Sequence, residues 1–271
     1  MASAILQRAT AKVSRRLVWF LAMLYFLAIL DRVNIGFAAS GLNRALGLNA
    51  EQFGFGAGLF FFGYLVFEVP SNLALARFGA RRWIARIMVT WGLCSTAVIF
   101  AQGPISFYIL RFLLGAAEAG FFPGVIWFLA NWFPAAARAR MNALFVLGLP
   151  LSNATAAAIS GPILGLNGVA GVSGWQWLLL LEGVPSIIVG VITWFYLTDT
   201  PRDATWLSAE ERAALVAALA AEPTPGARMT LWQAMVNPTL WILGLSYLGT
   251  NVGLVTLGLW LPQIVSAMGL G

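Results

Sequence analysis

The chain has 271 residues, of which 60% are hydrophobic and only 10% are charged, and it contains no histidine. A water-soluble domain of this length needs far more polar surface, so the composition excludes one and indicates an integral membrane protein. The net charge of +6 comes mainly from arginines near the ends of apolar runs, so it indicates membrane topology and not a nucleic-acid partner.

Seven apolar runs have about the length that a helix needs to cross a bilayer. The first is too long for the hydrophobic region of a signal peptide, so we expect it to stay as the first span. The runs do not alternate between apolar and polar residues as barrel strands do. The third is short, and we expect its helix to extend into the flanks. The runs cover residues 17–39, 53–75, 83–100, 107–131, 141–164, 177–197 and 238–265.

The basic residues outside the spans are distributed unevenly. Thirteen precede the first span or follow the second, fourth and sixth spans, if Arg86 just inside the third run is counted, whereas the alternate loops hold only Arg44. The positive-inside rule therefore predicts a multi-pass protein of the inner (cell) membrane with its N-terminus in the cytoplasm.

The composition changes after Thr198, where the chain becomes charged and rich in proline as far as about Trp232. Ser208 and Glu211 have the spacing of a capping box, which predicts a short helix running to Ala221. We expect three parts: a six-helix transmembrane bundle at 1–198, a cytoplasmic linker with a short amphipathic helix at 199–232, and the first helix of a second bundle at 233–271.

The second run contains Gly54, Gly56, Gly58 and Gly63. Small residues let helices approach closely in a membrane, so we interpret these glycines as packing positions.

Four charged residues interrupt the apolar runs: Asp31 and Arg32 in the first, and Arg111 and Glu118 in the fourth. An ionised side chain in the bilayer is costly unless it faces a protein interior or a water-filled path and finds a partner. Helix rise places Glu118 about 10 Å deeper than Arg111. If the first and fourth helices are neighbours, all four residues can meet in one cavity that opens outwards. A static ion pair that only fixes helix register is the alternative.

This set of charges can couple a proton to an anion. A buried carboxylate without a cation is driven neutral, whereas one beside an arginine stays ionised. If Asp31 or Glu118 pairs with Arg32 or Arg111, protonation of the acid releases the arginine, whose planar fork matches a substrate carboxylate. Proton and anion then bind together, which is symport.

Four further polar residues in the spans are weaker candidates. Tyr64 and Asn34 can offer hydrogen bonds to a substrate, but packing or a bond to a neighbouring helix explains them equally well. We expect Glu68 and Glu182 to be structural, because both lie where they can reach an interface or a backbone amide.

Five short blocks in chain order carry a resemblance to a known family. They are LDRVNIGFA at 30–38, FEVPSN at 67–72, RFGARRWIAR at 77–86, RFLLGAAEAG at 111–120 and WLPQI at 260–264. Together they resemble the anion:cation symporter branch of the major facilitator superfamily, over nearly the whole chain. The resemblance implies an all-α membrane protein: a six-helix N-terminal bundle of a major facilitator fold, a cytoplasmic linker and a seventh transmembrane helix.

The resemblance also implies roles for individual residues. Asp31 and Glu118 match protonated acids, Arg32 and Arg111 match substrate-linked arginines, and Tyr64 matches a tyrosine that faces the central site. A further group, Arg77, Gly79 and Arg81, matches the cytoplasmic gate motif between the second and third helices.

Three departures from the family pattern are visible. Ala76 replaces the acidic residue usual in the gate motif, and Ile29 replaces a tyrosine that often precedes the aspartate. The family has twelve helices in two halves around a midplane site, whereas this chain holds the first half, the linker and one helix of the second. We expect a truncated product, a gene fragment or an incomplete sequence that does not transport alone.

The sequence therefore predicts proton-coupled uptake of a small organic carboxylate, of the sugar-acid or dicarboxylate class, by alternating access in a lipid bilayer. A proton-coupled exporter and a non-transporting membrane scaffold are the alternatives. We expect no enzyme, cofactor or metal site, because histidine, metal-ligand clusters and serine–base arrangements are lacking. The only lysine, Lys12, precedes the first span, which excludes a retinal pump.

Overall fold

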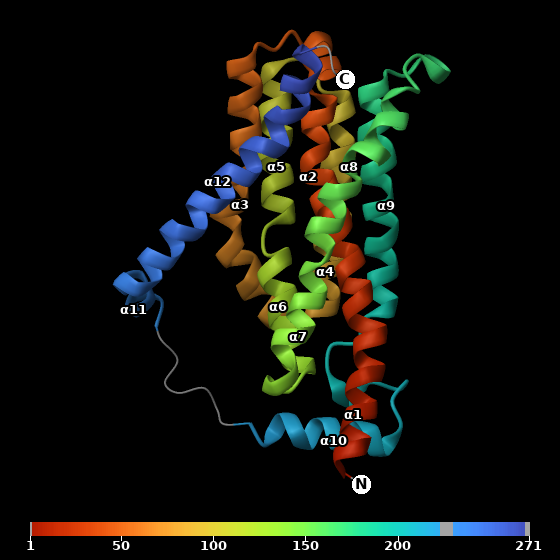
Figure 1. The fold of residues 1–271 in the computed structure, drawn as a ribbon, viewed down its shortest axis with the longest axis vertical. Coiled ribbons are helices and arrows are strands. Elements are labelled where there is room, and N and C mark those ends of the chain that lie inside the picture. Colours follow the sequence, from red (N-terminus) through yellow and green to blue (C-terminus); the bar gives the residue numbers. More distant parts are fainter. Residues whose placement is uncertain (1, 223–229, 269–271) are drawn as a thin grey trace. The chain divides into compact units, whose positions relative to one another are not determined.

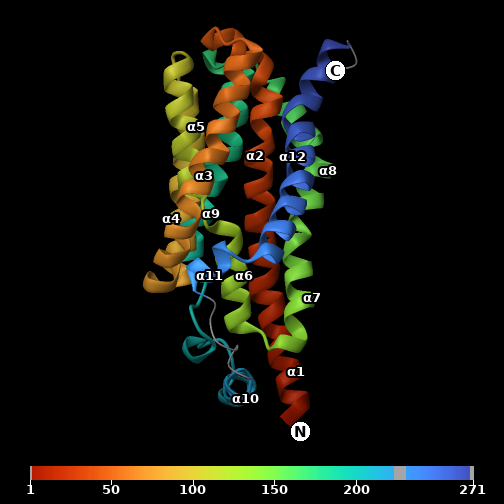
Figure 2. The ribbon, with the colours of Figure 1, turned by 90° about the vertical axis from the view of Figure 1, so that its left-hand side faces the viewer.

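The computed structural model describes residues 2–222 and 230–268, and every regular element in this part of the chain is a helix. The fold class predicted from the sequence, all-α, is confirmed. The chain divides into two compact units, Met1–Ala221 and Glu222–Gly271, and the long helices of the first unit run side by side (Figures 1 and 2). The division into a transmembrane bundle, a cytoplasmic linker and a further helix, with boundaries after residues 198 and 232, stays a prediction.

The helices of the first unit follow one another with short connections. They are α1 (Ala2–Val13), the π-helical turn η1 (Ser14–Val18), α2 (Trp19–Leu46), α3 (Ala50–Phe78), α4 (Ala80–Ala97), the 3-10 turn η2 (Val98–Phe100), α5 (Pro104–Glu118), α6 (Phe121–Trp132), α7 (Ala135–Val146), α8 (Gly148–Leu164), the 3-10 turn η3 (Val169–Gly171), α9 (Gly174–Tyr196), the 3-10 turn η4 (Pro201–Asp203) and α10 (Ala209–Ala220).

Seven helical segments in the described residues are long and apolar enough to cross a membrane, which confirms the predicted spans and a multi-pass protein. Several spans join more than one element. The first, Ala4–Leu46, contains α1, η1 and α2, and the fourth, Pro104–Trp132, contains α5 and α6. The third begins at Ala80, so it does extend beyond its predicted start.

Glycines bring α3 and α5 into close contact. A Cβ at Gly115 would meet the backbone carbonyl oxygen of Phe60, and a Cβ at Gly63 would meet that of Phe112. The packing role expected for the glycines of the second span therefore applies to Gly63, whereas Gly58 has open space around it. This contact fixes the position of α5, which carries two of the four charged candidates.

We expect Gly115→Ala to destabilise the first unit by about 1–3 kcal/mol, because the new methyl group meets backbone that cannot rotate away. Gly58→Ala is the matched control, since a Cβ there meets no atom within 4 Å. Thermal unfolding of the chain in detergent measures both. Equal melting temperatures for the two variants would show that the helices separate at little cost.

The predicted linker helix exists as α10 and packs against α1 in the first unit (Figure 1). Its capping box is confirmed: the Ser208 hydroxyl accepts from the Glu211 amide at 3.1 Å, and the Ser208 amide donates to the Glu211 carboxylate at 2.9 Å. That amide and the Lys12 ammonium hold the pKa of Glu211 below its usual value. The resulting stabilisation is present above the pKa of an unfolded glutamate and is lost as the pH falls through the lower folded value.

The second unit contains α11 (Leu231–Met235) and α12 (Pro238–Ala267). The seventh predicted span, 238–265, lies within α12, and large apolar side chains along it, such as Trp241 and Leu254, are exposed.

Candidate functional site

Asp31 lies on α2, is 2% exposed and is held by three neutral donors. The Ser95 hydroxyl and the Asn34 amide donate to one carboxylate oxygen, the latter at 3.2 Å. The Trp91 indole donates to the other oxygen at 3.0 Å. Ser95 and Trp91 belong to α4, so the carboxyl of the first span is bonded to the third span and not to its neighbour Arg32.

Arg32, the next residue, points to a different partner. Its guanidinium forms an ion pair with Glu118 at the end of α5. The Glu118 side chain is only 2% exposed, whereas that of Arg32 is 28% exposed. The Arg32 guanidinium also lies 5.4 Å from the ring centroids of both Phe60 and Tyr64 on α3. The first and fourth spans therefore meet through these side chains, which is the condition for the four charged residues to share one site.

Arg111 is 2% exposed and lies one heptad before Glu118 on α5. Its guanidinium is 5.0 Å from the centroid of the Phe60 ring, so this ring contacts both intramembrane arginines. Arg111 interacts electrostatically with Asp31 and Glu118. It forms no ion pair within 4.0 Å in the described part of the chain, and its Nε is buried without a hydrogen-bond partner there. Arg111 is thus a buried cation close to two acids but bonded to neither.

Two of the weaker candidates, Tyr64 and Asn34, have different partners in this arrangement. Tyr64 lies beside Arg32, on the same face of α3 as Phe60. Asn34 is 1% exposed, and its amide is engaged by Asp31. Asn34 therefore lies beside the acid of the first span, and its contact with substrate stays a prediction.

Glu182 on α9 is a further buried acid, 3% exposed, for which the sequence predicts a structural role. Its Oε1 accepts from the Ser160 hydroxyl at 3.0 Å. Its Oε2 is buried without a hydrogen bond of good geometry among the described residues, although Asn34 lies close enough to interact. Asn34 thus stands between Glu182 and Asp31. The signal for this was present in the sequence, as a further acidic residue inside an apolar run.

Glu68 on α3 is half-buried and interacts electrostatically with Arg32. It therefore adds a second acid on the side of Arg32, one turn from Tyr64.

The fourth span is interrupted directly after Glu118. Ala119 is extended, with φ −54° and ψ 135°, and Gly120 is left-handed, with φ 84°. Both are buried, and a Cβ at Gly120 would collide with the Ser71 side chain. Irregular backbone within a membrane is tolerated only where protein covers it or a wet cavity adjoins it. The apolar run at 107–131 predicts a single helix, although Gly120 and the nearby Pro123 are typical of a helix end and a new start.

The predicted gate residues lie at the junction of α3 and α4. Gly79 connects the two helices with φ 90°, a backbone conformation that favours glycine. The backbone amide of Arg81 donates to the Asp199 carboxylate at 2.8 Å, and the side-chain Nε of Arg81 lies 3.7 Å from the same carboxylate. Arg77 lies over the ring of Phe78. Asp199, which follows the sixth span, therefore lies beside the gate motif, in which Ala76 occupies the position that is usually acidic.

We expect Asp199→Ala to destabilise the first unit by about 1–2 kcal/mol, because the N-terminus of α4 loses both a hydrogen-bond acceptor and a negative charge. Asp199→Asn keeps an acceptor and loses the charge, so it should fall between Asp199→Ala and the unchanged chain. Chemical denaturation in detergent gives the three free energies of unfolding. Identical values would mean that the 2.8 Å contact contributes nothing to stability.

The fold and the site together define a helical membrane protein with a charged centre buried between its spans. The sequence matches the Major Facilitator Superfamily over residues 21–271. The chain belongs to this family, as its motifs predicted, and the family is one of transporters and not of enzymes.

Relatives and solved structures agree with this assignment. A protein of Agrobacterium vitis named as a tartrate transporter is 50% identical over 97% of this chain and 59% of its own length. The metabolite transport protein NicT of Pseudomonas putida is 45% identical over 96% of this chain and 60% of its own length.

The crystal structure of a bacterial homologue of the human lysosomal transporter Spinster, inward-facing and unoccupied, has the same fold. It superposes with a TM-score of 0.77 at 18% identity, over 95% of this chain and 56% of that one. The chain thus spans about 60% of the length of the curated relatives.

Proposed function

We propose that this chain forms the N-terminal part of a transporter that takes up a small organic anion, of the sugar-acid or dicarboxylate class, together with protons. One observation carries the proposal: the buried guanidinium of Arg111 and the partly exposed guanidinium of Arg32 contact the same ring, Phe60, and among the described residues only Arg32 of these two is in an ion pair. The relative named as a tartrate transporter supports a dicarboxylate, which has one carboxylate for each arginine.

The proposed coupling begins at Glu118. While it is ionised, Glu118 holds Arg32 in an ion pair. When Glu118 takes up a proton, the pair loses its attraction and Arg32, which is partly exposed, becomes free to turn towards a substrate carboxylate. Arg111, which forms no ion pair with any acid that the structure describes, binds the second carboxylate. Proton and substrate then favour each other's binding, as linkage requires.

Asp31 is the second proposed proton acceptor. Its neutral partners, Ser95, Trp91 and Asn34, can remain in place when it is protonated, because hydroxyl, indole and amide groups need no countercharge. A change of charge at Asp31 instead alters the field at Arg111, with which it interacts electrostatically. Glu118 thus acts on Arg32 through a direct ion pair, whereas Asp31 acts on Arg111 only through the electric field, and this distinguishes the two proposed proton sites.

The membrane orientation is part of the proposal. The thirteen-to-one distribution of basic residues supports a cytoplasmic N-terminus in the inner membrane. In a Cys94→Ser background, an impermeant thiol reagent added to intact cells should label Arg44→Cys and spare Arg8→Cys. The reverse labelling would overturn this orientation.

Transport is tested with the chain completed by the C-terminal half of the Agrobacterium vitis relative. Proteoliposomes with an inward proton gradient should accumulate labelled tartrate, and collapse of the gradient should stop accumulation. The 271-residue chain alone should not transport, because half of the walls around a midplane site are lacking. Efflux driven by an opposed proton gradient in place of uptake would identify an exporter. No proton-dependent flux in either direction would favour a scaffold.

A further inference from the structure

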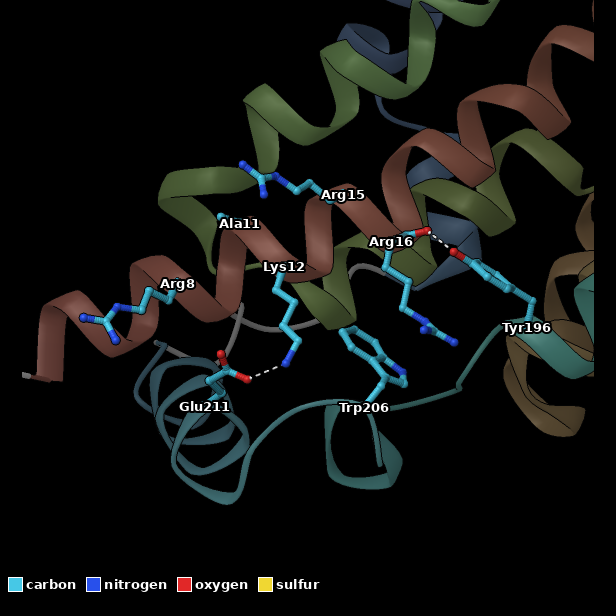
Figure 3. A pocket seen from close by; sticks show the side chains of 8 residues that line it. All are labelled: Arg8, Ala11, Lys12, Arg15, Arg16, Tyr196, Trp206 and Glu211. Atoms are coloured by element: carbon cyan, nitrogen blue, oxygen red, sulfur yellow. Dashed lines mark hydrogen bonds and ion pairs between the residues drawn. The ribbon is translucent and has the colours of Figure 1, made fainter.

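A cleft of about 670 Å³ lies at the N-terminal end of the first span, far along the helix from the charged site. It is lined by four basic residues from one stretch of helix, by the end of α9 and by the segment that precedes α10 (Figure 3). The basic residues are Arg8, Lys12, Arg15 and Arg16, and the aromatic ones are Tyr196 and Trp206.

Most of the positive charge in this cleft is uncompensated. Glu211 is the acid that lines it, and its carboxylate is engaged by Lys12 at 3.1 Å. Arg8, Arg15 and Arg16 form no ion pair within 4.0 Å in the described residues. Figure 3 shows Lys12 directed towards Glu211, whereas Arg8 and Arg15 extend away from that pair. Three guanidiniums are therefore available to an anion.

Arg16 is held in a fixed position. Its guanidinium lies 4.7 Å from the ring centroid of Tyr196 and 4.9 Å from that of Trp206. The Tyr196 hydroxyl donates to the Arg16 carbonyl at 3.1 Å, and the Arg16 Nε is buried without a hydrogen-bond partner in the described chain. Arg16 also lies in the π-helical turn Ser14–Val18, a local geometry that is frequent at functional sites. Two rings and a widened turn thus preorganise this cation.

The position of the cleft favours a lipid over a soluble anion. The helical segment Ala4–Leu46 is about 65 Å long, twice the hydrocarbon thickness, so its charged start projects beyond the bilayer core. Trp19, three residues after Arg16, is 53% exposed and lies near the start of the apolar run 17–39. Tyrosine and tryptophan beside arginine are typical of the headgroup region.

We propose that this cleft binds the phosphate of an anionic phospholipid headgroup, with Arg16 as the fixed contact and Arg8 and Arg15 closing over it. The acyl chains then lie along the apolar part of the first span. This site is independent of the transported substrate, so its test does not rest on the proposed transport activity.

The test uses the purified 271-residue chain in detergent and measures binding of phosphatidylglycerol by native mass spectrometry. Phosphatidylcholine and inorganic phosphate are the two comparison ligands. Loss of one basic contact near a membrane surface corresponds to about fivefold weaker binding, and loss of two to about thirtyfold. We therefore expect about fivefold for Arg16→Gln and about thirtyfold for Arg8→Gln with Arg15→Gln.

Arg44→Gln is the matched control, because Arg44 is an exposed arginine at the opposite end of the same span. It should bind phosphatidylglycerol as the unchanged chain does. The exposed pair Arg8 and Arg15 tests the proposal even if Arg16→Gln fails to fold. Equal affinity for phosphatidylcholine, an equal effect of Arg44→Gln, or competition by free phosphate at the same concentration as the lipid would each overturn the lipid site.

Discussion

Arg32→Ala should destabilise the first unit by about 3 kcal/mol, the lower end of the range for breaking a buried ion pair. The variant leaves the Glu118 carboxylate without its cation, at a position where only 2% of the side chain is exposed. The lower end applies because Arg32 itself is 28% exposed and Arg111 still interacts with Glu118. Chemical denaturation in detergent measures the loss of unfolding free energy, and thermal unfolding measures the accompanying fall in melting temperature.

A double-mutant cycle separates the ion pair from the packing of the two side chains. Glu118→Gln alone should cost less than Arg32→Ala, because water can reach the remaining guanidinium. Arg32→Ala with Glu118→Gln should lose less stability than the sum of the two single variants, since no buried charge is left unpaired. The loss in Arg32→Ala should also shrink as the pH falls, because a protonated Glu118 needs no cation. Additive losses would show that the pair contributes no coupling energy.

Arg111→Ala in the completed transporter should reduce tartrate uptake at low substrate concentration by about a hundredfold or more. The variant removes a buried guanidinium that offers two parallel hydrogen bonds to a carboxylate. Arg111→Lys should not restore uptake, because an ammonium is a point charge without that planar fork. Uptake of labelled tartrate per amount of reconstituted protein is the measurement.

Two controls make this result specific. Arg44→Ala removes an exposed arginine outside the site and should leave uptake unchanged. A substrate with one carboxylate should lose less from Arg111→Ala than tartrate does, if each arginine binds one carboxylate. Normal uptake by Arg111→Ala would remove the arginine pair from the proposal, even if the proton dependence through Glu118 remained.

The buried acids show which features of the site can be predicted from the sequence pattern and which cannot. Glu182 was visible in the sequence as a charge in an apolar run, but only the structure places it across Asn34 from Asp31. A helical pattern states which face a residue occupies. It does not state which neighbouring helix that face meets, because this depends on the rotation and tilt of both helices.

The sequence by itself determined the seven spans, the capping box of Ser208 and the family. These follow from interactions along one segment: the length of an apolar run needed to cross a bilayer, local bonds at a helix start, and motifs in fixed order.

Only the tertiary structure decided which charges pair. From the sequence, Asp31 and Glu118 can each pair with either Arg32 or Arg111. In the structure, Glu118 forms an ion pair with Arg32, whereas Asp31 accepts hydrogen bonds from Trp91 and Ser95. The break in the fourth span after Glu118 and the contact between Asp199 and the gate motif were likewise established only by the structure. The pairings depend on helices brought together from distant parts of the chain, where a few ångströms of helix placement select one partner over another.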